Sequence, residues 1–178
     1  MNITTTIERN VTNVHAEEIR ALQAAAFPQT EEFLTQRHWH TPLTDDSCWV
    51  GARIDGTLVG SVCLMFRTIT TPAGDFRIGG IGNVCSAPAT RGKGAAKACM
   101  NTAGAIIAAT CDFGVLGCGD VVLAFYESLG WSKIDNDVIW TDADGNRQLH
   151  DPNVMILPGQ QTLADWPTGT IDLNGPNW

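Results

Sequence analysis

The chain has 178 residues, 44% of them hydrophobic and 17% charged, with a formal net charge of −8 at pH 7. This composition is typical of a globular protein with its own buried core and excludes a disordered chain. The negative charge argues against nucleic acid or an anionic membrane as a partner and permits a cationic one. The length predicts a single domain over residues 1–178.

The sequence predicts a cytoplasmic protein without a bound metal. Residues 1–13 are polar and threonine-rich, unlike a signal peptide. No stretch approaches the roughly 18 apolar residues of a membrane-spanning helix. Six scattered cysteines contain no Cys-x-x-Cys pair, which favours buried reduced thiols over a zinc or redox site. The pair His38 and His40 has no predictable third ligand, so a surface or substrate-loop role is favoured over metal binding.

The N-terminal half predicts helices followed by an antiparallel meander. Residues 14–27 place Ile19, Leu22 and Ala26 on one helical face, and a second short helix is expected after Thr30. After a loop, strands 48–54 and 57–68 flank the sequence Asp-Gly, which is the strongest short signal for a hairpin. Another strand is expected over 76–87, where three glycines suggest a bulge.

The C-terminal half predicts alternating helices and strands. We expect a helix over 94–110, a strand over 113–116, a helix over 120–129 that ends at Gly130, and strands over 131–140 and 153–157. The tail from about 159 to 178 is rich in Pro, Gly, Asp and Asn, and is expected to wrap the surface toward the substrate site. The order of elements predicts a mixed α/β domain.

The most informative segment is Arg91-Gly92-Lys93-Gly94-Ala95-Ala96, between an expected strand and an expected helix. Its two glycines allow a close approach of the backbone to a ligand. The N–H groups at the start of the helix lack partners and carry partial positive charge, which suits a phosphate or pyrophosphate. The side chains of Arg91 and Lys93 add two full charges beside it.

A second motif follows about thirty residues later, with the sequence Ala-Phe-Tyr-Glu-Ser-Leu-Gly-Trp over 124–131. Together the two motifs resemble the GNAT superfamily of N-acetyltransferases, whose pyrophosphate loop reads Arg/Gln-x-x-Gly-x-Gly/Ala and whose later helix ends Phe-Tyr-x-x-x-Gly-Phe/Trp. The resemblance covers residues 48 to 140. It implies the GNAT fold, a central and mostly antiparallel sheet with splayed central strands flanked by helices.

The resemblance also implies acetyl-CoA as co-substrate. The backbone of residues 92–96 would hold its pyrophosphate with Arg91 and Lys93 nearby, and the strand Val84-Cys85-Ser86 would bind the pantetheine arm. A backbone N–H of Cys85 or Val84 would polarise the thioester carbonyl. Tyr126 is the expected general acid, which protonates the leaving thiolate. A homodimer is expected from family habit alone.

The acceptor suggested by a looser resemblance is an aminoglycoside antibiotic. Trp39 to Thr41, the Leu-Gly-Trp helix end, and a tail that contains Ala-Asp-Trp and closes on Trp178 are similar to aminoglycoside 2′-N-acetyltransferases. Acidic loops and tryptophans could attract and stack a cationic aminosugar. The substrate-binding candidates are Trp39, Asp45, Asp46, Asp142 and Trp178.

Two departures from that family change the expectation. Gly82 stands where the family has its proposed catalytic glutamate, and the tail lacks the acidic residue before the last tryptophan. The lost glutamate suggests an acceptor with fewer charges, of the kasugamycin type. The base would then come from one of His38, His40, Asp45, Asp46, Asp142, Asp172 or the terminal carboxylate. The alternatives are a GNAT enzyme for another amine (a polyamine, an amino acid or a protein N-terminus) and a catalytically silent acetyl-CoA-binding module.

Overall fold

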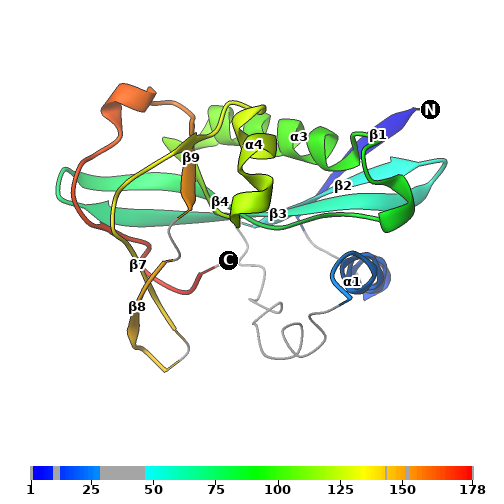
Figure 1. Ribbon diagram of the computed structural model, residues 1–178, viewed down its shortest axis with the longest axis horizontal. Coiled ribbons are helices and arrows are strands. Elements are labelled where there is room, and N and C mark those ends of the chain that lie inside the picture. Colours follow the sequence, from blue (N-terminus) through cyan, green and yellow to red (C-terminus); the bar gives the residue numbers. More distant parts are fainter. Residues whose placement is uncertain (1, 10–12, 29–46, 143, 151–152, 178) are drawn as a thin grey trace. The chain divides into compact units, whose positions relative to one another are not determined.

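A computed structural model describes residues 2–9, 13–28, 47–142, 144–150 and 153–177 (Figure 1). The chain divides into two compact units. Unit 1 comprises residues 1–65 and 83–103, and unit 2 comprises residues 66–82 and 104–178. The expectation of a single domain stays a prediction, and each unit is described separately below.

Unit 1 is built on an antiparallel sheet with helices packed against it. It contains β1 (Ile3–Glu8), α1 (Asn13–Ala26), β2 (Cys48–Ile54), the first part of β3 (Thr57–Thr71), the last part of β4 (Gly74–Ser86), the 3-10 turn η1 (Pro88–Thr90) and the first part of α3 (Ala95–Thr110). Strand β2 pairs with β1 on one side and with β3 on the other. The turn between β2 and β3 places Asp55 and Gly56 at φ values of 49° and 81°, which confirms the expected hairpin.

Helix α1 buries the face that the sequence predicts. Ile19 packs in a cluster with Trp49 of β2 and Cys63 of β3, while Leu22 and Ala26 pack with Cys85 of β4. Figure 1 shows α1 end-on beneath β2 and β3. The apolar positions recur every three to four residues, so one stripe of the helix is removed from water.

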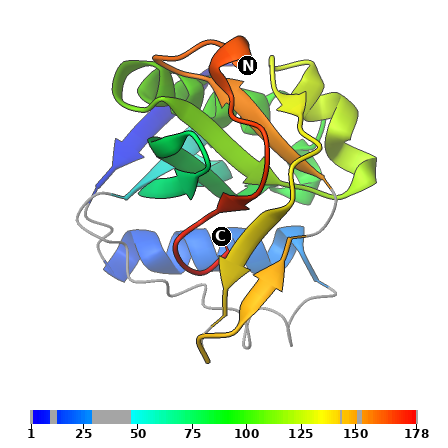
Figure 2. The same cartoon turned by 90° about the vertical axis from the view of Figure 1, so that its left-hand side faces the viewer.

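Unit 2 contains the remaining strands and a short helix. After the last part of β3 and the first part of β4 come β5 (Phe113–Gly117), η2 (Asp120–Val122), α4 (Leu123–Glu127), β6 (Ser132–Lys133), β7 (Val138–Thr141), β8 (Arg147–Leu149), β9 (Val154–Pro158), η3 (Leu163–Asp165) and β10 (Ile171–Asp172). Strand β9 pairs antiparallel with β5 and β6, and β4 pairs parallel with β5. Figure 2 shows β10 alongside β7, a parallel pair, and the β7–β8 hairpin.

The structure confirms the mixed α/β class and corrects several elements. The expected helix over 120–129 is a 3-10 turn followed by a five-residue α-helix, and the expected strand over 131–140 is two short strands. Strand β1 was not expected, because its sequence Ile-Thr-Thr-Thr-Ile-Glu has few apolar residues. In the structure this strand is largely exposed. The second expected helix lies outside the described residues.

The C-terminal tail does more than wrap the surface. Ile171 and Leu173 are fully buried in the core of unit 2. The Trp166 ring meets Phe113 edge to face at 4.9 Å, and its Nε1–H donates to Asn136 Oδ1 at 2.9 Å. The tail therefore contributes side chains to the core of unit 2.

No helix in the described parts of the chain is long and apolar enough to cross a membrane.

The core of unit 2 is closely packed around Gly114 of β5. A Cβ placed on Gly114 would lie 2.9 Å from Ile107 Cδ1 and 2.9 Å from Trp131 Cη2.

Replacing this glycine is expected to destabilise the protein. Gly114→Ala should lower the free energy of unfolding by about 1–3 kcal/mol, because the added methyl group overpacks a filled interior. Gly119→Ala is the matched control, since nothing lies within 4 Å of its Cβ position and its φ is −81°. Urea unfolding of both variants measures the difference, and equal midpoints would contradict the packing argument.

Candidate functional site

The glycine loop of unit 1 leads from the end of β4 into α3. The Ala87 N–H donates to Val59 O at 2.8 Å, which holds the loop entrance against β3, and the Lys93 N–H donates to Thr90 O at 3.1 Å. Gly92 and Gly94 have φ values of 75° and 89°, in the left-handed region that side chains disfavour. The loop conformation therefore requires both glycines.

The first turn of α3 presents backbone donors beside this loop. The first intrahelical bond runs from the Ala98 N–H to Gly94 O at 2.9 Å, so the preceding N–H groups have no partner within the helix. A Cβ on Gly92 would meet nothing within 4 Å, and one on Gly94 would meet only Ile3 Cδ1 at 3.9 Å. Unpaired donors, the helix dipole and open space together suit an anionic ligand.

The same turn rests on β3 through a close contact. The Cβ position of Gly60 lies 3.1 Å from Ala95 Cβ and 3.2 Å from the Ala95 carbonyl carbon. Ala95 is buried while Gly94 is exposed. One side of the first turn of α3 therefore packs on the sheet, and the other side is exposed and open to a ligand.

Arg91 holds the loop to helix α1. Its Nη2 donates to Ala26 O at 2.8 Å, at the C-terminal end of α1, where a cation is favoured by the helix dipole. The sequence places Arg91 near the phosphates, but the structure shows its guanidinium engaged with a backbone carbonyl. Lys93 is exposed on the loop. The contribution of both cations to phosphate binding stays a prediction.

Strand β4 changes conformation near the residues expected to bind pantetheine. Its parallel ladder with β5 ends at Ile81 and Leu116, and Asn83 has a φ of 55°. The sequence suggests a bulge at the glycines of this strand, and the structure has the left-handed residue directly after Gly82. Asparagine tolerates this conformation better than most residues with a side chain.

The three pantetheine candidates on β4 differ in exposure. Val84 and Ser86 are half-buried, and Cys85 is buried, with its Sγ 3.3 Å from Ser61 Oγ. Burial raises the pKa of the Cys85 thiol. It therefore stays protonated at neutral pH and packs against α1 without acting as a nucleophile.

Tyr126 lies in α4 of unit 2 and is buried. Its ring makes edge contacts with Phe125 and Trp131, at centroid distances of 5.1 and 6.5 Å. Burial, followed by the nearby Cys118 thiol, raises the pKa of Tyr126. The phenol therefore keeps its proton across the physiological pH range, which is the state that a general acid needs.

The described acidic candidates are held by their own surroundings in unit 2. Asp142 accepts hydrogen bonds from the backbone of Asp144 and Asn146 and from the Gln148 side chain, and these donors, Gln148 first, lower the pKa of Asp142. Asp172 pairs with Arg147 at 2.7 Å. The other substrate and base candidates, Trp39, Asp45, Asp46, His38, His40 and Trp178, lie outside the described residues.

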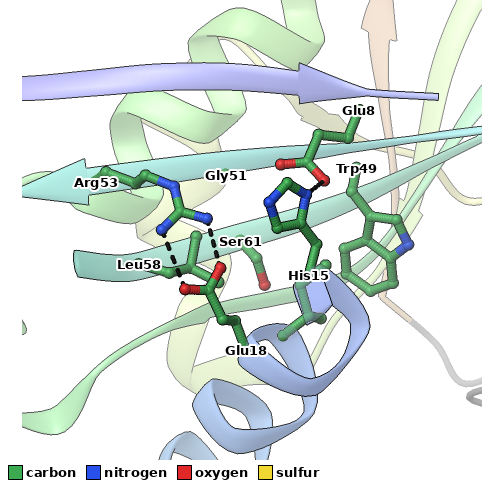
Figure 3. A pocket seen from close by; sticks show the side chains of 9 residues that line it. Glu8, His15, Glu18, Trp49, Gly51, Arg53, Leu58 and Ser61 are labelled. Atoms are coloured by element: carbon green, nitrogen blue, oxygen red, sulfur yellow. Dashed lines mark hydrogen bonds and ion pairs between the residues drawn. The ribbon is translucent and has the colours of Figure 1, made fainter. Parts of the chain in front are cut away.

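Unit 1 also has a polar pocket where α1 faces strands β1 and β2. The sequence did not predict this pocket, because it did not predict strand β1. Figure 3 shows α1 facing β1 and β2 there through two ion pairs, Glu8 with His15 and Glu18 with Arg53. The shortest contacts are 2.5 and 2.6 Å. Hydrogen bonding from Arg53 is the main cause that lowers the pKa of Glu18. Each pair joins α1 to a strand: His15 contacts Glu8 of β1, and Glu18 contacts Arg53 of β2.

No group of three or more potential metal ligands occurs among the residues that the structure describes. In sequence, the model of the acetyltransferase (GNAT) domain matches residues 8–134. No curated protein matches the chain.

Solved structures of similar fold agree with that match. A GNAT-family N-acetyltransferase of Escherichia coli, solved in complex with CoA, has 16% identity and a TM-score of 0.66, over 98% of this chain and 91% of that one. An acyl-CoA N-acyltransferase of Pseudomonas aeruginosa has 18% identity and a TM-score of 0.61, over 88% and 99%. A conserved protein of Enterococcus faecalis has 23% identity and a TM-score of 0.60, over 73% of this chain, which spans only 32% of that protein.

Proposed function

Since the chain belongs to the GNAT family of acetyltransferases, we propose that it transfers the acetyl group of acetyl-CoA to an amine of a cationic aminosugar antibiotic. The observation that carries the donor half of this proposal is the start of α3. Gly92 and Gly94, both at positive φ, face open space beside backbone N–H groups that have no partner within the helix. Such a site fits the pyrophosphate of CoA without needing a metal ion.

The reaction is a direct transfer to the amine. The neutral amine nitrogen attacks the thioester carbonyl carbon, and a backbone N–H of Val84 or Cys85 stabilises the oxyanion. The nitrogen, now positively charged, gives one proton to the base or to solvent, and the carbon–sulfur bond then breaks. The thiolate takes a proton from Tyr126, which is later reprotonated from solvent. The products are the acetamide and CoA. The role of Tyr126 is carried over from the family motif. Burial, which raises the pKa of Tyr126, keeps the phenol protonated before the transfer but also makes it a weaker acid.

The acceptor half rests on charge and on the looser resemblance. The net charge of −8 favours a cationic substrate, and the tryptophan-containing segments resemble those of aminoglycoside 2′-N-acetyltransferases. Gly82 cannot serve as a base, which favours a less charged, kasugamycin-type acceptor. Asp142 and Asp172 are engaged in a turn and an ion pair. We therefore expect the base among His38, His40, Asp45, Asp46 and the terminal carboxylate.

The acceptor is tested by measuring thiol release from acetyl-CoA across a panel of aminoglycosides, including kasugamycin, together with polyamines, amino acids and peptides. Release should be fastest with an aminoglycoside, and mass spectrometry should locate the acetyl group on its 2′-amine. Release only with spermidine or a peptide would overturn the antibiotic substrate. Binding of acetyl-CoA without release on any acceptor would favour a silent acetyl-CoA-binding module.

The role of Tyr126 predicts a kinetic effect without a binding effect. Tyr126→Phe removes the phenolic proton while keeping the buried ring, so kcat should fall by about a hundredfold or more. The Kd for acetyl-CoA, measured by calorimetry, should change little. An unchanged kcat would remove Tyr126 from the mechanism.

The glycine loop predicts a binding effect that a second glycine controls for. Gly94→Ala forces a side chain into the left-handed region, at a cost of about 1 kcal/mol, at the point where the ligand would approach. Gly56→Ala creates the same strain in the β2–β3 turn, where φ is 81° and nothing lies within 4 Å of the Cβ position. Both variants should lose similar stability, but only Gly94→Ala should weaken acetyl-CoA binding. Equal Kd values for the two variants would contradict the loop assignment.

A further inference from the structure

Helix α1 contains a buried amide without a partner. The Gln23 side chain is only 4% exposed, and its Nε2 has no hydrogen-bond partner within the described structure. A buried donor left unpaired is costly, and most buried polar groups in folded proteins bond to the protein, to an ordered water or to a ligand. The amide is therefore a candidate for contact with a bound molecule.

The helical spacing locates Gln23 over the two central strands of unit 1. Ile19, one turn before it, packs with Cys63 of β3, and Ala26, nearly one turn after it, packs with Cys85 of β4. Residues three and four apart share a helix face. Gln23 therefore occupies the position on this face between the one that covers Cys63 and the one that covers Cys85.

The register of β3 and β4 identifies the strand residues at that level. The Ala87 N–H bonds to Val59 O, and Cys85 Sγ lies beside Ser61 Oγ. Counting two residues further along each strand from this pair leads to Asn83 on β4 and Cys63 on β3. Asn83 is the left-handed residue of β4, and it directly precedes the two residues whose N–H groups are the oxyanion candidates. Gln23 thus lies at the level of the β4 segment that would hold the thioester.

We propose that Gln23 Nε2 donates a hydrogen bond to the acetyl carbonyl oxygen of bound acetyl-CoA. This inference rests on the proposed function. A donor with so little exposure suits a small acceptor group that reaches the strand, and a thioester carbonyl is such a group. When the amine attacks, this oxygen gains negative charge, and a neutral amide fixed beside it stabilises that charge. Gln23 thereby supplies a side-chain donor next to the backbone donor of Val84 or Cys85.

The test compares acetyl-CoA with CoA, which differs only by lacking the acetyl group. Gln23→Met keeps the length of the side chain and removes the donor. Its Kd for acetyl-CoA should rise about tenfold, the effect of one hydrogen bond, while its Kd for CoA should stay that of the wild type. Its Tm should stay unchanged or rise, because the substitution removes an unpaired buried polar group.

Gln160→Met is the matched control. The Gln160 Nε2 donates to Ala109 O at 3.0 Å, so its partner lies within the protein. This variant should leave the Kd values of both ligands unchanged.

Three results would overturn the assignment of Gln23. A lower Tm of Gln23→Met with an unchanged ratio of the two Kd values would make the amide structural. Equal weakening of both ligands would indicate a packing effect, and a higher acceptor KM with an unchanged ratio would indicate a contact with the acceptor. Failure of the proposed function would give a different result, namely no thiol release by the wild type. The ratio of the Kd for acetyl-CoA to the Kd for CoA can still be measured in that case, because it depends on binding alone.

Discussion

The contact between β3 and the first turn of α3 is the constraint on which the donor site depends. Because Gly60 has no side chain, Ala95 can sit directly on the strand, with only 3.1 Å between its Cβ and the Cβ position of Gly60. That contact fixes where the helix begins and therefore where its unpaired N–H groups lie. The left-handed glycines of the loop then let the chain turn into the helix without placing a side chain in front of those groups. The proposed phosphate binding in unit 1 would thus depend on backbone placement more than on charged side chains.

Charged side chains have a different task in unit 1, which is to hold α1. Arg91 bonds the carbonyl at the end of this helix. Near its beginning, His15 pairs with Glu8 of β1 and Glu18 pairs with Arg53 of β2. Figure 3 shows the latter two pairs between α1 and the strands. Partly exposed ion pairs contribute little to stability, typically below about 1 kcal/mol each. We infer that their main effect is to hold α1 in place. This helix carries Gln23 and covers the strand residues that acetyl-CoA would contact.

The polar chemistry of β4 is also supplied mainly by the main chain. Gly82 offers no functional group, the Cys85 thiol is buried with a raised pKa, and Asn83 has a left-handed backbone conformation. Oxyanion stabilisation would then depend on N–H groups and on neutral amides, which do not change charge with pH. Such a site separates activation of the carbonyl from deprotonation of the amine, and only the second function requires a titratable base.

The sequence by itself determined the features that depend on local chemistry. Asp55-Gly56 predicts the hairpin, the spacing of Ile19, Leu22 and Ala26 predicts the buried face of α1, and the glycine loop predicts left-handed residues before α3, since each follows from backbone preference or short-range periodicity. The loop and the later Phe-Tyr motif also identified the family.

Only the tertiary structure decided what depends on partners distant in sequence. Strand β1 is polar and forms because β2 offers it an edge. Arg91 could bind a phosphate or a carbonyl, and the position of Ala26 selects the carbonyl. The spacing of α1 places Gln23 on the same face as Ile19 and Ala26, but how deeply its amide is buried depends on how the helix lies against the sheet.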